Sequence, residues 1–150
     1  MRGRDGARIE GELRGRNAVV VHHEHWELGI GSSIRVGVAR ALEISPDLDS
    51  LVVLVCDQPH VTADLVASLR QMQDKERKPI VACGYAGSAG VPALFARSLF
   101  PKLLSLRDGG GAREIILQGG AEVALVPFPE GAIDIDTPAD ALAYLDGGKV

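Results

Sequence analysis

Two acidic points, each at the end of a predicted β-strand, are the residues best placed to do chemistry. Asp57 directly follows the apolar run Leu51–Cys56, whose composition predicts a strand buried on both faces of a parallel sheet. Pro59 ends the strand because it lacks an N–H group. Open α/β sheets bind ligands beyond the carboxyl ends of their strands, so Asp57 is a candidate Mg²⁺ ligand. An aspartate that only closes a turn with its own backbone fits the same position.

The second acidic point is the segment Asp134–Pro138. Alternation along a short strand places Asp134 and Asp136 on one face. A capping role at the start of the final helix explains the same residues without a metal. Two acidic points at strand ends suit a shared metal ion better than either does alone. We therefore favour a metal site shared by Asp57 and the segment that holds Asp134 and Asp136.

Glycine-rich turns mark two further segments. Gly29–Ser33 follows a predicted strand (residues 17–22) and opens a helix for which Ser32 or Ser33 is the expected N-cap. Backbone N–H groups at a helix start bind anions or polar base edges, and glycine allows close approach. The pattern is neither a dinucleotide fingerprint nor a Walker loop, because the third glycine and the lysine are absent. We interpret Gly109–Gly111 as a flexible linker before a helix rather than a phosphate loop.

The histidines and cysteines are weaker candidates for site residues than the acidic residues. Strand alternation separates the side chains of His22–His25, so we interpret this segment as a polar strand end and a surface loop. His60 is a candidate contact for a substrate phosphate only because it lies close to Asp57 in sequence. Cys56 and Cys83 lie in or beside predicted buried strands, which predicts reduced, packed thiols.

The elements that must position these residues alternate along the chain. Strands that alternate with helices predict βαβ units and an α/β fold of three layers with a mostly parallel sheet. A length of 150 residues suits a single domain, 1–150, in which residues 1–16 form a frayed or partial helix. The predicted strands are 17–22, 51–56, 79–83, 91–95 and 122–126, and the predicted helices begin near residues 32, 62, 97, 112 and 138.

Composition excludes several classes of partner. A hydrophobic content of 46% and a charged content of 24% are ordinary for a soluble globular protein. The net charge of −4 argues against binding to nucleic acid or to anionic membrane surfaces. No apolar run approaches the roughly 20 residues of a transmembrane helix, and no secretory signal is visible. We therefore expect a cytoplasmic protein.

Four stretches, in this order and spacing, resemble the molybdenum cofactor nucleotidyltransferases, and most closely their cytidylyltransferase branch: Trp26–Gly37, Cys56–Thr62, Gly90–Phe95 and Val126–Asp140. The likeness covers nearly the whole chain from about residue 8 onward. It implies a Rossmann-like nucleotidyltransferase fold. It also implies Mg²⁺-dependent transfer of CMP or GMP from CTP or GTP to the phosphate of a molybdopterin-type acceptor, with release of pyrophosphate.

The resemblance implies a role for each candidate site residue. The catalytic metal ligands would be Asp57 and Asp136, with Asp134 as its neighbour. The residues near the base and ribose of the nucleotide would be Gly31, Ser32 and Ser33. The residues on the pterin side would be Gly90 and Pro92.

The chain departs from the family pattern at its start. The family opens with a strand and a Gly-rich loop containing Ser, Arg and Lys that cradles the triphosphate, and no such stretch precedes residue 17. Gly110 also stands where the family often has lysine. We therefore expect a fold without the first strand and phosphate loop, and weak or absent catalysis by this chain. Strand edges left open in this way favour a homo-oligomer.

Two alternatives stay open beside this enzyme hypothesis. One is a nucleotidyltransferase that acts on another phosphorylated small molecule. The other is a non-catalytic binding or assembly module for molybdoenzyme maturation. The sequence does not decide between CTP and GTP.

Overall fold

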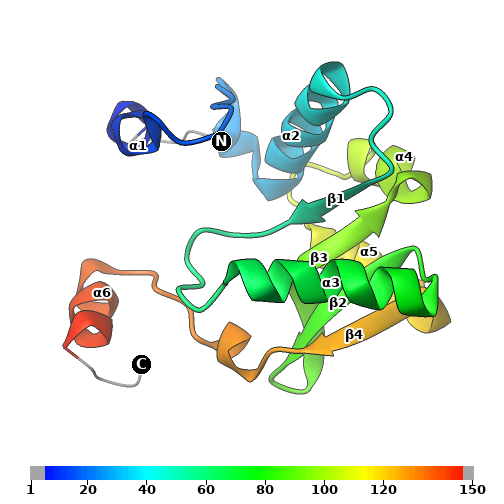
Figure 1. The fold of residues 1–150 in the computed structure, drawn as a ribbon. Coiled ribbons are helices and arrows are strands. Elements are labelled where there is room, and N and C mark those ends of the chain that lie inside the picture. Colours follow the sequence, from blue (N-terminus) through cyan, green and yellow to red (C-terminus); the bar gives the residue numbers. More distant parts are fainter. Residues whose placement is uncertain (1–5, 147–150) are drawn as a thin grey trace.

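The structure is a computed structural model that describes residues 6–146, with side chains from residue 10 onward. Within this part of the chain, one sheet of four strands has the order β1-β3-β2-β4. The strands are β1 (Ser50–Val53), β2 (Ile80–Tyr85), β3 (Ser88–Ala96) and β4 (Val123–Pro127), as Figure 1 shows.

Three of the four strands run in one direction. β2 pairs with β4 in parallel, and β3 lies antiparallel between β1 and β2. The strand β3 reverses because β2 and β3 form a tight antiparallel hairpin. Its two turn residues, Ala86 (φ 49°) and Gly87 (φ 70°), adopt the left-handed backbone that a two-residue turn between twisted strands requires.

Helices cover both faces of the sheet, which confirms the three-layer α/β fold. Helix α3 (Ala63–Glu76) packs against β2, β3 and β4 on one face. The opposite face is covered by α2 (Ile30–Ile44), α4 (Phe100–Leu104) and α5 (Ala112–Gly119). Apolar side chains therefore cover both faces of the sheet. Figure 1 shows the helices on either side of it.

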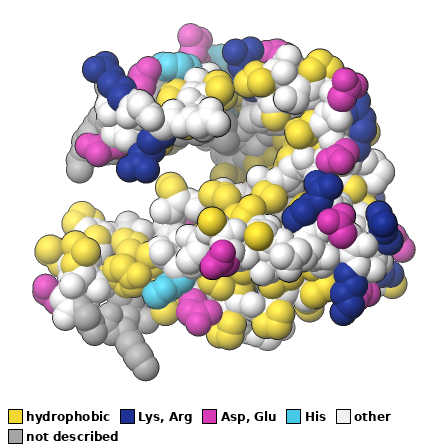
Figure 2. All heavy atoms as spheres, viewed as in Figure 1, with side chains coloured by type: hydrophobic (Ala, Val, Ile, Leu, Met, Phe, Trp, Pro, Cys, Tyr) yellow, Lys and Arg dark blue, Asp and Glu magenta, His cyan; other side chains and the backbone are white. Residues whose placement is uncertain are grey.

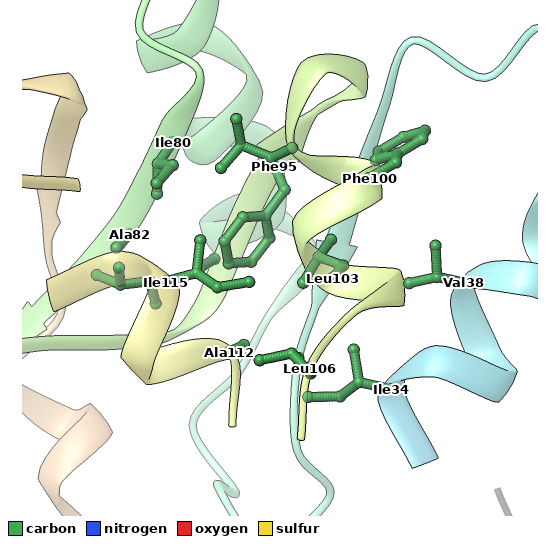
Figure 3. Packing of buried hydrophobic residues seen from close by; sticks show 13 residues of the cluster. Ile34, Val38, Ile80, Ala82, Phe95, Phe100, Leu103, Leu106, Ala112 and Ile115 are labelled. Carbon is green, nitrogen blue, oxygen red and sulfur yellow. The ribbon is translucent and has the colours of Figure 1, made fainter. Parts of the chain in front are cut away.

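The side chains of β2 alternate between two hydrophobic clusters. Ile80 and Ala82 point toward α5, and Val81 and Cys83 point toward α3. Figure 3 shows the first cluster, in which the fully buried ring of Phe95 lies among side chains from the sheet, α4 and α5. The apolar residues of α2 extend this cluster, so the start of α2 is positioned by the core.

The remaining elements are short. They are α1 (Gly6–Leu13), α6 (Pro138–Leu145), and the 3-10 helices η1 (Trp26–Leu28), η2 (Arg97–Leu99), η3 (Gly120–Glu122) and η4 (Pro129–Ala132). Residues 1–5, the start of the predicted partial helix, lie outside the described residues. No helix in the described part of the chain is both long enough and apolar enough to cross a membrane.

Two of the helices expected from the sequence begin at a side-chain cap. The Thr62 hydroxyl accepts a hydrogen bond from the Leu65 N–H at 3.2 Å. Thr137 and Asp140 form a reciprocal capping box at the start of α6. The predicted cap of α2 is wrong: the helix begins at Ile30, so Gly29 takes the cap position instead of Ser32 or Ser33.

Two strand predictions are also wrong, one because no strand forms and one because the strand is shorter than predicted. Residues 17–22 form no β-strand, and β1 ends at Val53 rather than Cys56. In the described part of the chain, β1 lies at the edge of the sheet beside β3. Its residues are half-buried rather than buried on both faces, and Cys56 beyond it is exposed. The expectation of a packed thiol therefore holds for Cys83 alone, and both thiols are free.

Candidate functional site

The start of α2 lies against the backbone of the glycine-rich loop before α5. The Gly31 N–H donates a hydrogen bond to the Asp108 carbonyl at 2.9 Å. A Cβ atom at Gly31 would lie 1.9 Å from the Arg107 carbonyl oxygen and 2.6 Å from that of Gly110. Only glycine allows this approach, so the helix start and the loop form one closely packed unit.

Arg35, one turn further along α2, strengthens the same junction. Its guanidinium donates to the Leu106 carbonyl and pairs with the Asp108 carboxylate at 2.5 Å. The loop that we interpreted as a flexible linker is therefore held at its beginning by α2. Its sequence alone gave no sign of this partner, because Arg35 lies more than seventy residues away.

An apolar groove of about 490 Å³ lies between α2 and β1. Ile34 and Val38 line it on the helix side, and Leu51 and Val53 line it on the strand side. Ser33 and Gly90, two of the predicted site residues, also line this groove, as does Arg113 of α5. The groove can accept the apolar body of a ligand while polar groups stand at its rim.

Gly90 and Pro92 lie in β3 and have different surroundings. Gly90 packs under the Tyr85 ring, since a Cβ atom there would lie 2.3 Å from the Tyr85 hydroxyl oxygen. The same hydroxyl donates to the Val91 carbonyl at 2.9 Å. Pro92 follows a cis peptide bond and is fully buried, so it supports the strand and does not line the groove.

The two acidic points meet through the backbone. The Ile135 N–H donates to the Asp57 carbonyl at 2.8 Å, which brings the segment of Asp134 and Asp136 beside the loop that follows β1. Asp134 and Asp136 are exposed on either side of Ile135. Figure 2 shows a hollow on the side of the molecule where α6 lies.

Two buried oxygen atoms at this junction have no hydrogen-bond partner among the described residues. They are Asp57 Oδ1 and Gln58 Oε1. Gln58 is only 6% exposed and donates through its other amide atom, Nε2, to the Gly131 carbonyl at 2.9 Å. A buried carboxylate oxygen without a donor is costly unless a cation or a donor of a ligand approaches it.

A divalent cation fits this donor set. Magnesium binds in proteins through one or two carboxylates and takes its other ligands from phosphates and water. Asp57 offers an unpartnered oxygen, and Asp134 and Asp136 stand in the neighbouring segment. In the described residues, no group of three or more His, Cys, Asp or Glu side chains is assembled for a metal, so substrate oxygens would complete the shell.

The histidines lie in unexpected places. His60 packs edge-to-face against Tyr144 of α6, with 5.4 Å between the ring centroids. His23 hydrogen-bonds Ser32, with 2.8 Å between Nε2 and Oγ. The sequence gave no signal for either contact, because neither pair follows a helix or strand period. His23 and Arg113 are the residues at this site that sequence reasoning missed.

Ligand sites of α/β proteins lie beyond the carboxyl ends of the strands, and helix starts in these proteins bind phosphate groups. Sequence comparison identifies the family within this class. The family model described as "MobA-like NTP transferase domain" matches residues 3–123. The chain therefore belongs to this family of nucleotidyltransferases. No curated protein matches the chain.

Three solved structures are similar. Rv0371c from Mycobacterium tuberculosis H37Rv is 27% identical with a TM-score of 0.68, and the match covers 95% of this chain and 72% of that one. Its homolog from Mycobacterium sp. strain JC1 is 25% identical with a TM-score of 0.58, over 77% of this chain and 56% of that one. A complex of Rv0371c with manganese is 24% identical with a TM-score of 0.64, over 95% and 73%, and at this identity shows the fold alone.

Proposed function

We propose that this chain is a molybdenum cofactor nucleotidyltransferase of the cytidylyltransferase type. An oxygen of the acceptor phosphate on molybdopterin attacks the α-phosphorus of CTP or GTP. The bond from the α-phosphorus to the bridging oxygen breaks, and pyrophosphate leaves with its electron pair. The observation that carries the proposal is the buried, unpartnered Asp57 Oδ1 beside the segment of Asp134 and Asp136, in a chain of the NTP transferase family.

The acids would hold a magnesium ion, which supplies neutralisation of the negative charge on the phosphates. Asp57 has the rigid position for this role, because Ile135 holds its carbonyl and the neighbouring Gln58 is fixed to η4. The manganese complex of Rv0371c supports a divalent cation in this fold. Phosphoryl transfer depends mostly on positioning and charge neutralisation, so few protein groups are needed.

The remaining site residues would bind and orient the two substrates. Ser33 and the close-packed turn at Gly31 would lie beside the base and ribose, and Ser32 supports this turn from its buried position. Gly90 would border the acceptor, and the apolar groove that it shares with Ser33 suits a flat ring system. Pro92 would act only by keeping β3 in place, since it is buried.

The non-catalytic alternative rests on the glycine-rich loop. The backbone carbonyls of Arg107 and Gly110 face Gly31, so much of this loop is used in packing α2. A binding or assembly module of molybdoenzyme maturation would keep the fold and the groove while it lacks a cradle for the triphosphate. A different phosphorylated acceptor would leave the nucleotide side of the proposal unchanged, and analysis of the reaction product distinguishes it.

Calorimetric titration of CTP and of GTP, each with and without Mg²⁺, tests the proposal. Wild type should bind one of them in a Mg²⁺-dependent way, and Asp57→Asn should bind at least about tenfold more weakly, since contacts to charged groups are worth roughly 1.5–3 kcal/mol. The matched control is Asp47→Asn, which neutralises an exposed aspartate outside the site. Equal affinity of Asp57→Asn and wild type would contradict the assigned role of this carboxylate.

A second measurement separates the enzyme from the module. Molybdopterin and the nucleotide that binds are incubated with the protein and Mg²⁺, and pyrophosphate is measured. Release of pyrophosphate that depends on molybdopterin supports the transferase. Nucleotide binding without pyrophosphate release supports the non-catalytic module.

A further inference from the structure

The Ser32 side chain at the start of α2 is buried and bonded on two sides. It is 2% exposed. Its Oγ lies 2.7 Å from the Gly29 carbonyl oxygen and 2.8 Å from His23 Nε2. The hydroxyl therefore joins the turn that begins the helix to a residue that precedes η1.

The direction of these hydrogen bonds follows from the chemistry of the three groups. A carbonyl oxygen can only accept, so the single proton of the Ser32 hydroxyl is directed to Gly29. The Ser32 oxygen must then accept from His23, whose Nε2 carries the hydrogen. His23 is thus a donor here and not a base, and Ser32 is not activated as a nucleophile.

The turn that this pair supports has few other attachments. Gly29 has a left-handed φ of 121°, and its carbonyl accepts from the Ser33 N–H at 3.3 Å as well as from Ser32. On the opposite side, Gly31 is fixed to the Asp108 carbonyl. His23 and Asp108 therefore hold the first turn of α2 from two sides, and both anchors come from outside the helix.

We propose that His23 is a positioning residue for the nucleotide. It fixes the Ser32 hydroxyl and, through it, the conformation of Gly29–Ser33, without contact to the ligand itself. This inference rests on the proposed function, in which the same turn borders the base and ribose. It gives the histidine-rich segment a role that involves neither a metal nor acid–base chemistry.

The test compares the affinity for CTP or GTP, whichever binds wild type, in variants of two histidines of one segment. His23→Leu removes the donor at similar size and should bind about threefold to tenfold more weakly, the effect of one lost hydrogen bond. His23→Gln places an amide N–H near the position of Nε2 and should restore affinity to within about twofold of wild type. The control His25→Leu removes an exposed imidazole from the same segment and should leave affinity unchanged.

Rescue by glutamine separates positioning from packing. Weaker binding by His23→Leu with recovery in His23→Gln supports the inference, provided that both variants unfold within a few degrees of wild type. Equal weakening in both variants overturns it, because then the shape of the imidazole matters and its donor does not. Unchanged binding by His23→Leu also overturns it.

Two further outcomes are decided in the same experiment. If His23→Leu does not fold, His23→Asn takes its place, since its amide lies nearer to the position of Nδ1 and cannot reach Ser32 in the same way. Weaker binding by that variant supports the inference and unchanged binding overturns it. Absence of nucleotide binding by folded wild type overturns the proposed function and this inference together, whereas failure of the inference alone leaves wild-type binding intact.

Discussion

Gly31→Ala is the substitution whose effect can be worked out most directly from the structure. The added Cβ atom would lie 1.9 Å from the Arg107 carbonyl oxygen and 2.6 Å from that of Gly110. Both atoms are backbone, so neither can rotate away as a flexible side chain would. The loop must instead move by more than 1 Å to reach an ordinary contact, and this movement breaks the bond from the Gly31 N–H to Asp108.

The size of the effect follows from these two losses. Overpacking of a close contact costs about 1–3 kcal/mol, and a lost hydrogen bond costs about 0.5–1.5 kcal/mol. Together they lower the free energy of unfolding by roughly 2–4 kcal/mol. In a chain of this size, each kcal/mol shifts the melting temperature by about 2–4 °C, so Gly31→Ala should melt roughly 5–15 °C lower than wild type.

Thermal unfolding followed by circular dichroism checks this prediction, with Gly37→Ala as the matched control in the same helix. A Cβ atom at Gly37 would meet no atom of the described residues within 4 Å. Alanine is about 0.5–1 kcal/mol better than glycine inside a helix, so Gly37→Ala should melt slightly higher than wild type. Opposite shifts are therefore expected from the same chemical change, and an unchanged melting temperature in Gly31→Ala would refute the reasoning.

Three further measurements test the core, the last helix and the thiols. Phe95→Ala, in the centre of the first cluster, should lose about 3–5 kcal/mol in urea unfolding, and a loss below 1 kcal/mol would contradict its central place. Hydrogen bonds from the side chain and the backbone N–H of Thr137 hold the pKa of Asp140 below its ordinary value of 3.8. This lowered pKa stabilises α6 above pH 3.8, and the effect is lost as the pH falls through the folded-state pKa. The protection of α6 amides, measured relative to their intrinsic exchange rate at each pH, should therefore fall in acid in wild type and change less in Thr137→Ala. Burial raises the pKa of the Cys83 thiol to about 11. At pH 8 a thiol reagent should therefore modify the exposed Cys56 first and reach Cys83 only when the protein unfolds. Rapid reaction of both thiols in the folded protein would contradict this prediction.

The parts of the fold that could be predicted are those that depend on local chemistry. Thr62 and Thr137 mark the starts of α3 and α6 in the sequence, because a helix cap depends only on residues within one turn. Residues 17–22 have the composition of a strand and yet form only an isolated β-bridge at His22, since pairing along a whole strand depends on residues distant in sequence. The length of β1 was overestimated for the same reason, because an edge strand is paired on one side only.

The same distinction between local features and contacts with distant segments applies to the candidate site. The hydrogen bond from Ile135 to the Asp57 carbonyl brings the two acidic points together, although β1 ends at Val53 and the predicted short strand at residues 133–135 does not form. The metal role of these acids stays a prediction. The contacts of Ser32 could not be predicted, because its partner His23 precedes a 3-10 helix and follows no period. Glycine at position 31 suggested a close approach, but the loop that approaches it is distant in sequence.

The hairpin of β2 and β3 has a consequence for how the chain opens. Its strands are neighbours in sequence, joined by two turn residues, and they include the most deeply buried side chains of both clusters. The start of α2 and the loop at Asp57 are held by a few hydrogen bonds to distant segments. Amide hydrogens in the hairpin should exchange only with global unfolding, and those at Gly31, Ser33 and Ile135 should exchange through local opening. Substitutions in the loop at Asp57 can therefore weaken the proposed nucleotide binding while the protein stays folded.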